Sequence, residues 1–470
     1  MDCDVLVIGS GPGGYRAAVL AALRGQKTVI VERQTWGGCC LNRGCVPKKA
    51  WHHSAQLLDA AAGFSDRGLL GGVRGDLAQA WRHQHQVVNT VRDSYQQYLK
   101  RLGVVALEGE ATFEGPGAVL VKPSDTLIHA ASIILATGSE PSVPSDLPVV
   151  PGRILQSDLL FDEPVPEGSR VIVIGAGIVG MEFAYILRKF ERDVLWFTRS
   201  DPFARKDFSP VAMGLMRQRM TDLGVAPVRG AVKSLSADAQ GVRLESEEGG
   251  IWTGDWALLA TGRRPVTAGL GLTRVGIVVD GAGFIPVDAT MQTPVPGIYA
   301  IGDCVAGPMT ANRALYEAGL VVDNILAPTP RLRDLLRVPE AIYGAVELAR
   351  IGLSEEQAED AGLEPAVGFA AFEVSPQALG QGKPEGYVRL IADLDSGALL
   401  GGEVVGAQAG ELIHMLSGAP AEGALRHIAA TAFNHPARTE EFQNAVETLA
   451  AKWKLESHVF GVKPAADGGD

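Results

Sequence analysis

The chain is poor in three features that would each identify a class of protein. It has 5 cysteines in 470 residues, too few for a small secreted scaffold stapled by disulfides. No apolar run approaches the ~18 residues of a membrane span, and the N-terminus lacks the basic and long apolar segments of a secretory signal. Positive charge is also scarce, because 42 Lys and Arg against 54 Asp and Glu give a net charge of −12. We therefore expect a cytoplasmic protein that binds neither membranes nor nucleic acid.

The composition is otherwise that of a large globular protein. A length of 470 residues predicts about three domains. The hydrophobic fraction of 46% and the charged fraction of 20% are ordinary for a folded chain. Glycine is abundant, with 57 residues and no collagen-like period. The glycines are therefore expected in turns and in close approaches of the backbone.

A dinucleotide-binding pattern opens the chain. An apolar run at residues 5–8 leads into a glycine-rich turn at 9–14, and a predicted helix and a second apolar strand follow. Glu32 ends that strand 18 residues after Gly14, where a carboxylate can accept hydrogen bonds from a ribose. The glycines let the backbone approach a pyrophosphate at the helix N-terminus. The expected binding residues are Gly9, Gly11, Gly14 and Glu32.

The same pattern recurs in the middle of the chain. An apolar run at 171–174 precedes a second glycine turn, but the residue 18 positions after Gly180 is Thr198 rather than an acid. Arg199 and Arg205 follow, and arginines in place of a carboxylate favour the 2′-phosphate of NADP(H). In the alternative, both arginines are solvated loop charges and the nucleotide is NAD(H). The expected glycines are Gly175, Gly177 and Gly180.

Three cysteines follow Glu32 closely. Cys40 and Cys45 are five residues apart, and a regular helix would separate them by roughly 7.5 Å along its axis. A disulfide tolerates about 6.8 Å between Cα atoms, so bridging requires an irregular helix start, which Gly44 favours. Spacing alone leaves Cys39 as an equally close partner. A redox-active pair is the favoured interpretation, and a metal site and inert thiols are the alternatives.

A histidine and a glutamate near the C-terminal end could serve such a pair. His435 and Glu440 stand in the pattern His-Pro-Ala-Arg-Thr-Glu. Thiol–disulfide exchange proceeds through thiolates, so a group that titrates near neutral pH must take and return a proton. An imidazole oriented by a carboxylate has those properties. Taken alone, this spacing is more often without a catalytic role.

Together these segments resemble the class I pyridine nucleotide-disulfide oxidoreductases over roughly residues 2–455. The resemblance implies an α/β fold with two Rossmann-like dinucleotide-binding domains, for FAD and NAD(P), and a C-terminal α+β dimerisation domain. We expect the FAD-binding domain at 1–146 and 268–337, the NAD(P)-binding domain at 147–267, the interface domain at 338–455 and a mobile tail at 456–470.

The resemblance also implies roles for single residues. Cys40 and Cys45 match the redox disulfide, with Cys45 facing the flavin and Cys40 exchanging with substrate. Lys49 matches a lysine beside flavin N5 and Glu182 its acidic partner. His435 and Glu440 match an acid–base pair that reaches the disulfide of the other subunit, which implies a homodimer. Two further FAD-binding residues are expected, Gly138 of an Ala-Thr-Gly box and Asp303 on the ribityl chain, and no metal is expected.

Within that family the motifs are most similar to those of dihydrolipoamide dehydrogenases, as in Gly-Pro-Gly-Gly-Tyr at 11–15. The expected substrate is a lipoyl group on a carrier protein, or a small dithiol or disulfide. Phe433 and Asn312 depart from the histidines usual in those enzymes, and the stretch at 43–49 is closer to some glutathione reductases. Two alternatives follow: an NADPH-dependent reductase of another disulfide or of a metal ion, or a catalytically silent flavoprotein acting as a binding partner or redox sensor.

Overall fold

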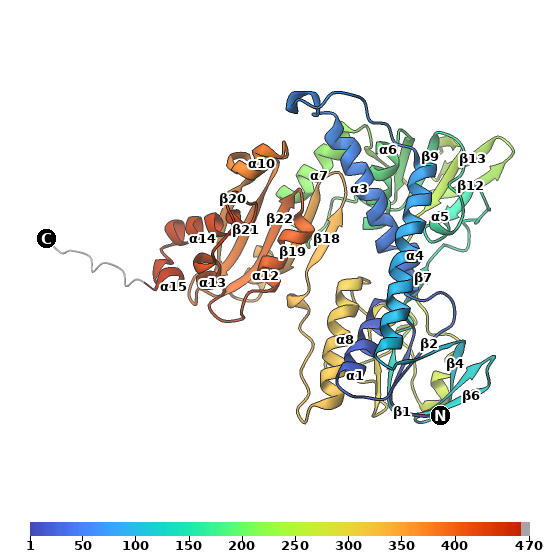
Figure 1. Ribbon diagram of the computed structural model, residues 1–470. Coiled ribbons are helices and arrows are strands. Elements are labelled where there is room, and N and C mark those ends of the chain that lie inside the picture. Colours follow the sequence, from blue (N-terminus) through green and yellow to red (C-terminus); the bar gives the residue numbers. More distant parts are fainter. Residues whose placement is uncertain (462–470) are drawn as a thin grey trace. The chain divides into compact units, whose positions relative to one another are not determined.

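The computed structural model describes residues 1–461, and Figure 1 follows the course of the chain. The chain divides into two compact units, each with its own hydrophobic core. The first unit comprises residues 1–64, 70–200 and 227–333, and the second comprises residues 65–69, 201–226 and 334 onwards.

The first sheet of the first unit is parallel in its interior and antiparallel at one edge. Its strands lie in the order β3-β2-β1-β6-β5-β4, and β17 pairs with β6. The interior strands are runs of Val, Ile and Leu buried on both faces, as a covered parallel sheet requires. Because β17 returns to this sheet from far along the chain, the first nucleotide module is discontinuous. The strands are β1 (Asp2–Ile8), β2 (Thr28–Glu32), β3 (Val105–Glu108), β4 (Glu110–Gly115), β5 (Ala118–Lys122), β6 (Thr126–Leu135) and β17 (Ile298–Ala300).

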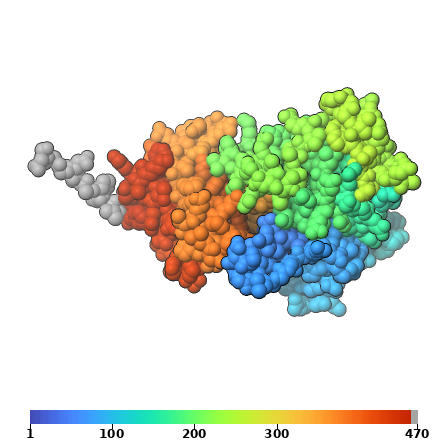
Figure 2. Space-filling view, turned by 90° about the horizontal axis from the view of Figure 1, so that it is seen from above, coloured from blue at the N-terminus to red at the C-terminus, as the bar shows by residue number. Residues whose placement is uncertain are grey.

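A second parallel sheet repeats the arrangement of strand, glycine turn and helix. Its order is β11-β10-β9-β15-β8, and a three-stranded antiparallel sheet, β12-β13-β14, follows it in the chain. Figure 2 shows this small sheet at the surface in yellow-green. The strands are β8 (Ile154–Gln156), β9 (Arg170–Ile174), β10 (Asp193–Thr198), β11 (Pro227–Arg229), β12 (Val232–Asp238), β13 (Gly241–Ser246), β14 (Ile251–Gly254) and β15 (Trp256–Leu259).

A two-stranded ribbon marks where the chain enters and leaves the second module. Strand β7 (Ser139–Pro141) pairs antiparallel with β16 (Arg263–Pro265). Each strand lies just after an Ala-Thr-Gly box, and because the strands are antiparallel, the two boxes lie at opposite ends of the ribbon. The second module is therefore an insertion into the first.

Helices that cover the first unit also place its cysteines. Trp51 of α3 is fully buried against Phe161 and Phe183, which fixes α3 on α6. Helix α3 packs against α4 as well, and α1 packs against α8. The helices of this unit are α1 (Pro12–Leu23), α2 (Gly38–Arg43), α3 (Cys45–Ala61), α4 (Leu77–Arg101), α5 (Leu159–Asp162), α6 (Ile178–Lys189) and α8 (Ala311–Leu326).

The second unit is an antiparallel sheet covered by helices. Its strand order is β18-β19-β22-β21-β20, and α14 packs its buried apolar face on β20 and β21. The strands are β18 (Glu340–Tyr343), β19 (Glu347–Gly352), β20 (Pro365–Ala371), β21 (Gly386–Asp393) and β22 (Leu399–Gly406). The helices are α7 (Pro210–Asp222), α9 (Glu355–Asp360), α10 (Pro376–Gly380), α11 (Ala409–Leu412), α12 (His414–Ser417), α13 (Ala424–Ala430), α14 (Glu440–Trp453) and α15 (Glu456–Phe460).

Residues 201–226, which the sequence assigns to the NAD(P) domain, pack in the second unit. The reason is a buried polar cluster at the start of α7. Glu403 of β22 accepts hydrogen bonds from Ser209 Oγ at 2.6 Å and from Ser209 N at 2.8 Å, and Tyr387 donates to the same carboxylate at 2.7 Å. No contiguous sequence pattern reveals such a long-range attachment.

The predicted fold class is confirmed, since the chain has two parallel-sheet modules and a C-terminal antiparallel domain. Of the predicted tail, Glu456–Phe460 forms α15, and residues 462–470 lie outside the described residues. Within residues 1–461, no helix is both long and apolar enough to cross a membrane.

Candidate functional site

The two glycine turns have the same construction. A Cβ on Gly9 would lie 2.3 Å from the carbonyl oxygen of Ala136, and one on Gly14 would lie 1.9 Å from that of Gly9. These two glycines are required by packing. A Cβ on Gly11 would meet nothing within 4 Å, and Gly11 caps α1 without a side-chain hydrogen bond. The open space and the uncapped helix N-terminus fit a pyrophosphate.

The second turn repeats this geometry. Cβ atoms on Gly175 and Gly180 would lie 2.2 Å from the oxygen of Ala260 and 2.4 Å from that of Gly175. Gly177 again faces open space and caps α6 without a side chain. Both modules can therefore hold a dinucleotide.

The residues that end β2 and β10 differ. The Glu32 carboxylate is buried and accepts hydrogen bonds from Ser10 Oγ at 2.7 Å and from Gln34 N at 2.8 Å. Its orientation is thus fixed. Oε2 already accepts from both Ser10 Oγ and Ser10 N, and Oε1, which accepts from Gln34 N, keeps capacity to accept from a ribose. Thr198 is also buried, and its hydroxyl has no hydrogen-bond partner among residues 1–461.

The two candidate phosphate-binding arginines are in different situations. Arg199 directly follows β10 and is exposed. Arg205 belongs to the segment that packs in the second unit, where its Nε donates to Asp207 Oδ1 at 3.0 Å. The charge of Arg205 is already matched by a carboxylate, so this arginine loses much of its attraction for a phosphate.

The cysteine pair straddles a break between two helices. Helix α2 ends at Arg43 and α3 begins at Cys45, with Gly44 between them outside helical geometry. This is the irregular start that the spacing predicts. Cys40 and Cys45 are unbonded thiols in hydrogen-bonding contact. The hydrogen bond from Cys40, helped by the charge of Lys48, lowers the pKa of Cys45 to about 7, while the same bond raises the pKa of Cys40.

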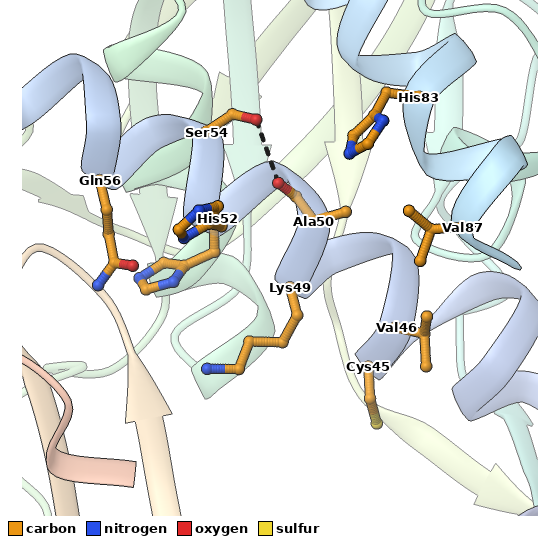
Figure 3. A pocket seen from close by; sticks show the side chains of 10 residues that line it. Cys45, Val46, Lys49, Ala50, His52, Ser54, Gln56, His83 and Val87 are labelled. Atoms are coloured by element: carbon orange, nitrogen blue, oxygen red, sulfur yellow. Dashed lines mark hydrogen bonds between the residues drawn. The ribbon is translucent and has the colours of Figure 1, made fainter. Parts of the chain in front are cut away.

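Glu182 pairs with a lysine that sequence reasoning missed. The resemblance pairs Glu182 with Lys49, and the structure places the ammonium group of the adjacent Lys48 on its carboxylate. The side chain of Glu182 is 1% exposed and that of Lys48 is 17% exposed, so the pair is shielded from water. Lys49 lines a pocket together with Cys45, and Figure 3 shows both side chains on one side of α3. The presence of two adjacent lysines, at 48 and 49, is the sequence feature that could have indicated the contact of Lys48 with Glu182.

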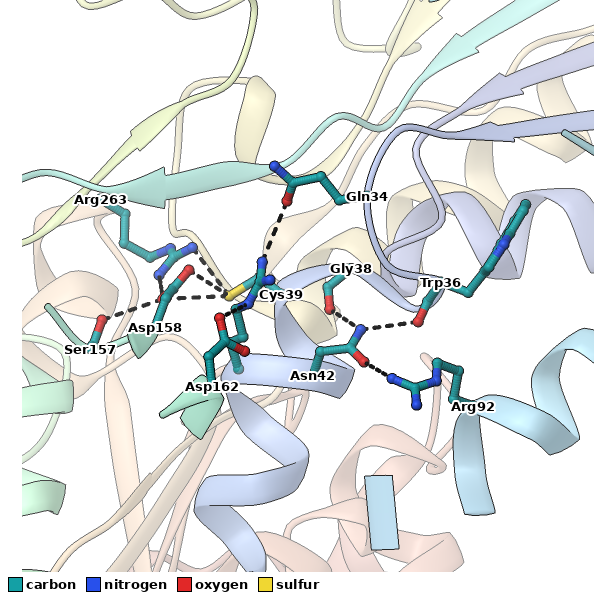
Figure 4. Close-up of polar contacts among 11 residues, drawn as sticks. Gln34, Trp36, Gly38, Cys39, Asn42, Arg92, Ser157, Asp158, Asp162 and Arg263 are labelled. Carbon is teal, nitrogen blue, oxygen red and sulfur yellow. Dashed lines mark hydrogen bonds and ion pairs between the residues drawn. The ribbon is translucent and has the colours of Figure 1, made fainter. Parts of the chain in front are cut away.

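Cys39 belongs to a separate polar cluster (Figure 4). Arg263 Nη2 donates to Cys39 Sγ at 3.2 Å, and Arg263 Nη1 donates to Asp158 Oδ1 at 3.0 Å. Burial raises the pKa of Cys39 to about 12, with Arg263 acting in the opposite direction. Cys39 is therefore a protonated thiol near neutral pH, unlike Cys45.

The same arginine connects Cys39 to a predicted flavin-binding residue. Arg263 Nε donates to Ser139 Oγ at 2.8 Å, and Ser139 Oγ donates to Asp303 Oδ2 at 2.6 Å. A continuous hydrogen-bonded chain thus runs from the start of α2 to Asp303. Gly138, next to Ser139, has a φ of 72° and open space where its Cβ would be. Arg263 carries no motif signal that sequence reasoning used.

In the second unit, His435 and Glu440 contact each other as their spacing suggests. His435 Nδ1 lies 2.8 Å from Glu440 Oε1, and Ala437 N donates to Glu440 Oε2 at 2.7 Å. These bonds lower the pKa of Glu440. Glu440 is the first residue of α14, where the helix dipole favours a carboxylate. The His435 side chain is 75% exposed, so its Nε2 is open to a docking molecule.

Comparison with known proteins agrees with this geometry. A sequence model described as pyridine nucleotide-disulphide oxidoreductase matches residues 3–318, and the dimerisation domain of that family matches residues 338–446. Dihydrolipoyl dehydrogenase from Thermus scotoductus is 36% identical over 457 residues, covering 95% of this chain and 97% of that protein.

Two solved structures share the fold. LpdA from Mycobacterium tuberculosis has a TM-score of 0.87 at 23% identity, covering 94% of this chain and 99% of that chain. The HOCl-induced flavoprotein disulfide reductase RclA from Escherichia coli has a TM-score of 0.81 at 25% identity, with the same two coverages. Because the family matches reach over both units, the chain belongs to the pyridine nucleotide-disulphide oxidoreductases, and it works with FAD and a pyridine nucleotide.

Proposed function

We propose that the protein is a homodimeric dihydrolipoamide dehydrogenase, which oxidises the dithiol of a lipoyl group on a carrier protein and reduces NAD(P)⁺. The observation that carries the proposal is the cysteine pair. A thiol with a pKa near 7 beside one with a raised pKa allows one member to be a thiolate while the other exchanges with substrate. The relatives named dihydrolipoyl dehydrogenase, at 33–36% identity, supply the substrate class.

FAD, when bound, supplies the exchange of an electron pair with the cysteines and of a hydride with the nicotinamide. Gly11 and Glu32 in the first module, and Asp303 beyond the inserted module, would hold it. In the oxidised enzyme, a substrate thiolate attacks Cys40 of the disulfide, and Cys45 leaves as a thiolate. The second substrate thiolate then attacks the mixed disulfide and releases Cys40, which closes the substrate disulfide.

His435 is the proposed acid–base group. Its Nδ1 is held by Glu440, which leaves Nε2 to take a proton from the substrate thiol. Glu440 stabilises the imidazolium that results. We propose that the exposed imidazole serves the cysteine pair of the partner subunit, as the dimerisation domain suggests.

For the nucleotide we propose NADP(H), because β10 ends in Thr198 rather than in a carboxylate. Arg199 is the proposed donor to the 2′-phosphate. Arg205 supports this less than the sequence suggests, because Asp207 neutralises it. NAD(H) is the alternative.

The test is anaerobic oxidation of dihydrolipoamide by the purified flavoprotein, with NAD⁺ and NADP⁺ in parallel. Rapid turnover with either nucleotide supports the proposal, and the better acceptor decides what Arg199 does. No turnover, combined with rapid bleaching of the flavin by NADPH, would instead favour a reductase of another disulfide. A flavin that no pyridine nucleotide bleaches would indicate a catalytically silent flavoprotein.

A further inference from the structure

The segment that carries His435 has little structure of its own. Residues 431–439, between α13 and α14, contain neither helix nor strand. Glu440 orients the imidazole, but the two residues are close neighbours in the chain. Their bond ties the ring to the first residue of α14, and through that helix to the domain, at one end of the segment. A contact with another part of the second unit would hold the segment from a second side.

Arg438 provides such a contact. It is 3% exposed, although it stands on a segment whose neighbours are largely solvated. Its Nε donates to Gln381 Oε1 at 2.8 Å, and its Nη2 donates to the backbone oxygen of Lys383. The guanidinium carbon lies 4.7 Å from the ring centroid of Phe372, which is fully buried. Arg438 thus joins the histidine segment to the turn that precedes β21.

The free energy of burying a charged arginine side chain opposes this attachment. A buried cation is costly unless it is paired, and both hydrogen-bond acceptors here are neutral. Nη1 is buried and has no hydrogen-bond partner within residues 1–461. Burial lowers the pKa of Arg438, and the charges of Glu441 and Glu347 act in the opposite direction. An apolar side chain would fill the site at less cost but could not reach two acceptors and a ring face together.

We propose that Arg438 is a positioning residue, which holds the His435–Glu440 pair at the distance from the dithiol that proton transfer requires. The inference rests on the acid–base role proposed for His435. A misplacement of about 1 Å by a remote change can cost on the order of 100-fold in rate. We therefore expect R438M to slow oxidation of dihydrolipoamide by roughly 10- to 100-fold.

A purely structural role for Arg438 predicts a different pattern, so two half-reactions are compared. Reduction of the flavin by NAD(P)H under anaerobic conditions uses groups of the first unit and not His435. R438M should leave that rate, and the FAD content, as in the wild type. The pH profile of dithiol oxidation should also change, because the imidazole no longer meets the thiol in its normal geometry. R438K, which keeps the charge and one donor, should recover part of the loss.

A double-mutant cycle with H435Q makes the test specific. If Arg438 acts through His435, R438M should cost little more in the H435Q background, because the group that it positions is already gone. R350M is the matched control. Arg350 is a largely buried arginine of the same unit, with Nη1 bonded to the backbone oxygen of Asp207 at 2.9 Å. R350M should lower Tm without changing the pH profile of dithiol oxidation.

Three outcomes overturn the inference. One is wild-type dithiol oxidation by R438M, and another is an equal loss in both half-reactions. The third is a loss of dithiol oxidation in the double variant that equals the product of the losses in R438M and H435Q. If H435Q itself oxidises dihydrolipoamide at the wild-type rate, the acid–base role of His435 fails first and removes the inference with it. Should R438M not accumulate as a folded flavoprotein, R438K and its double variant with H435Q are measured in the same way.

Discussion

The cysteine pair and the His435–Glu440 pair are held in opposite ways. Cys40 and Cys45 lie on two helices braced from several sides. Asn42 donates from its amide to Trp36 O at 3.0 Å, Arg43 Nε donates to Asp162 Oδ2 at 2.6 Å, and Lys48 pairs with Glu182. His435 stands on an irregular segment, and its side chain is 75% exposed.

The difference follows from what each pair must do. Electron transfer between two sulfurs and a flavin needs fixed distances, so a rigid surround is an advantage. A proton acceptor that meets a substrate must present an open nitrogen, so its ring cannot be enclosed. Glu440 therefore orients the His435 imidazole, and Arg438 attaches the segment to the turn before β21. The imidazole itself stays exposed.

The largest expected effect comes from removing the reactive sulfur of Cys45 from the rigidly held pair. Cys45→Ser should reduce oxidation of dihydrolipoamide by several orders of magnitude, because the pair acts as a unit. Cys39→Ser is the matched control one residue from Cys40. Its thiol is protonated and hydrogen-bonded, with a pKa of about 12, so a hydroxyl should replace it with little loss. Steady-state turnover measures both, and full activity in Cys45→Ser would falsify the disulfide mechanism.

A smaller effect is expected from loosening the exposed pair. Glu440→Gln keeps the shape of the side chain but removes the charge that stabilises the imidazolium. Dithiol oxidation should fall by about 10- to 100-fold, within the range typical of general acid–base catalysis. Bleaching of the flavin by NAD(P)H should be unchanged, and this serves as the internal control. Equal losses in both half-reactions would mean that Glu440 supports the fold rather than the chemistry.

The comparison also separates what sequence could predict from what it could not. The glycine turns at Gly9 and Gly175 follow from local spacing, because backbone geometry dictates both the turn and the open space for phosphate. The contact of His435 with Glu440 could also be predicted from the sequence, because the two residues are near each other in the chain. Long-range contacts could not be predicted from the sequence. No local pattern indicates the contact of Ser209 with Glu403 or of Arg438 with Lys383.

The contact of Lys48 with Glu182 could not be predicted from the sequence for a more local reason. The break at Gly44 lets α3 begin at Cys45, and the rotation of that helix decides which lysine faces α6. Residues three and four positions after Cys45 both lie near its face of the helix, so the sequence offers no way to choose. In the structure Lys48 contacts the buried Glu182 carboxylate.

The smallest expected effect sharpens that choice. In the reduced enzyme, Cys45 should react with iodoacetamide as a thiolate, so the rate should rise with pH and level off above its pKa of about 7. Lys48→Met removes a cation that favours the thiolate, so the midpoint should move to higher pH and alkylation near pH 6 should slow by up to about tenfold. Lys49→Met is the matched control on the next residue, and a larger shift there would contradict the role given to Lys48.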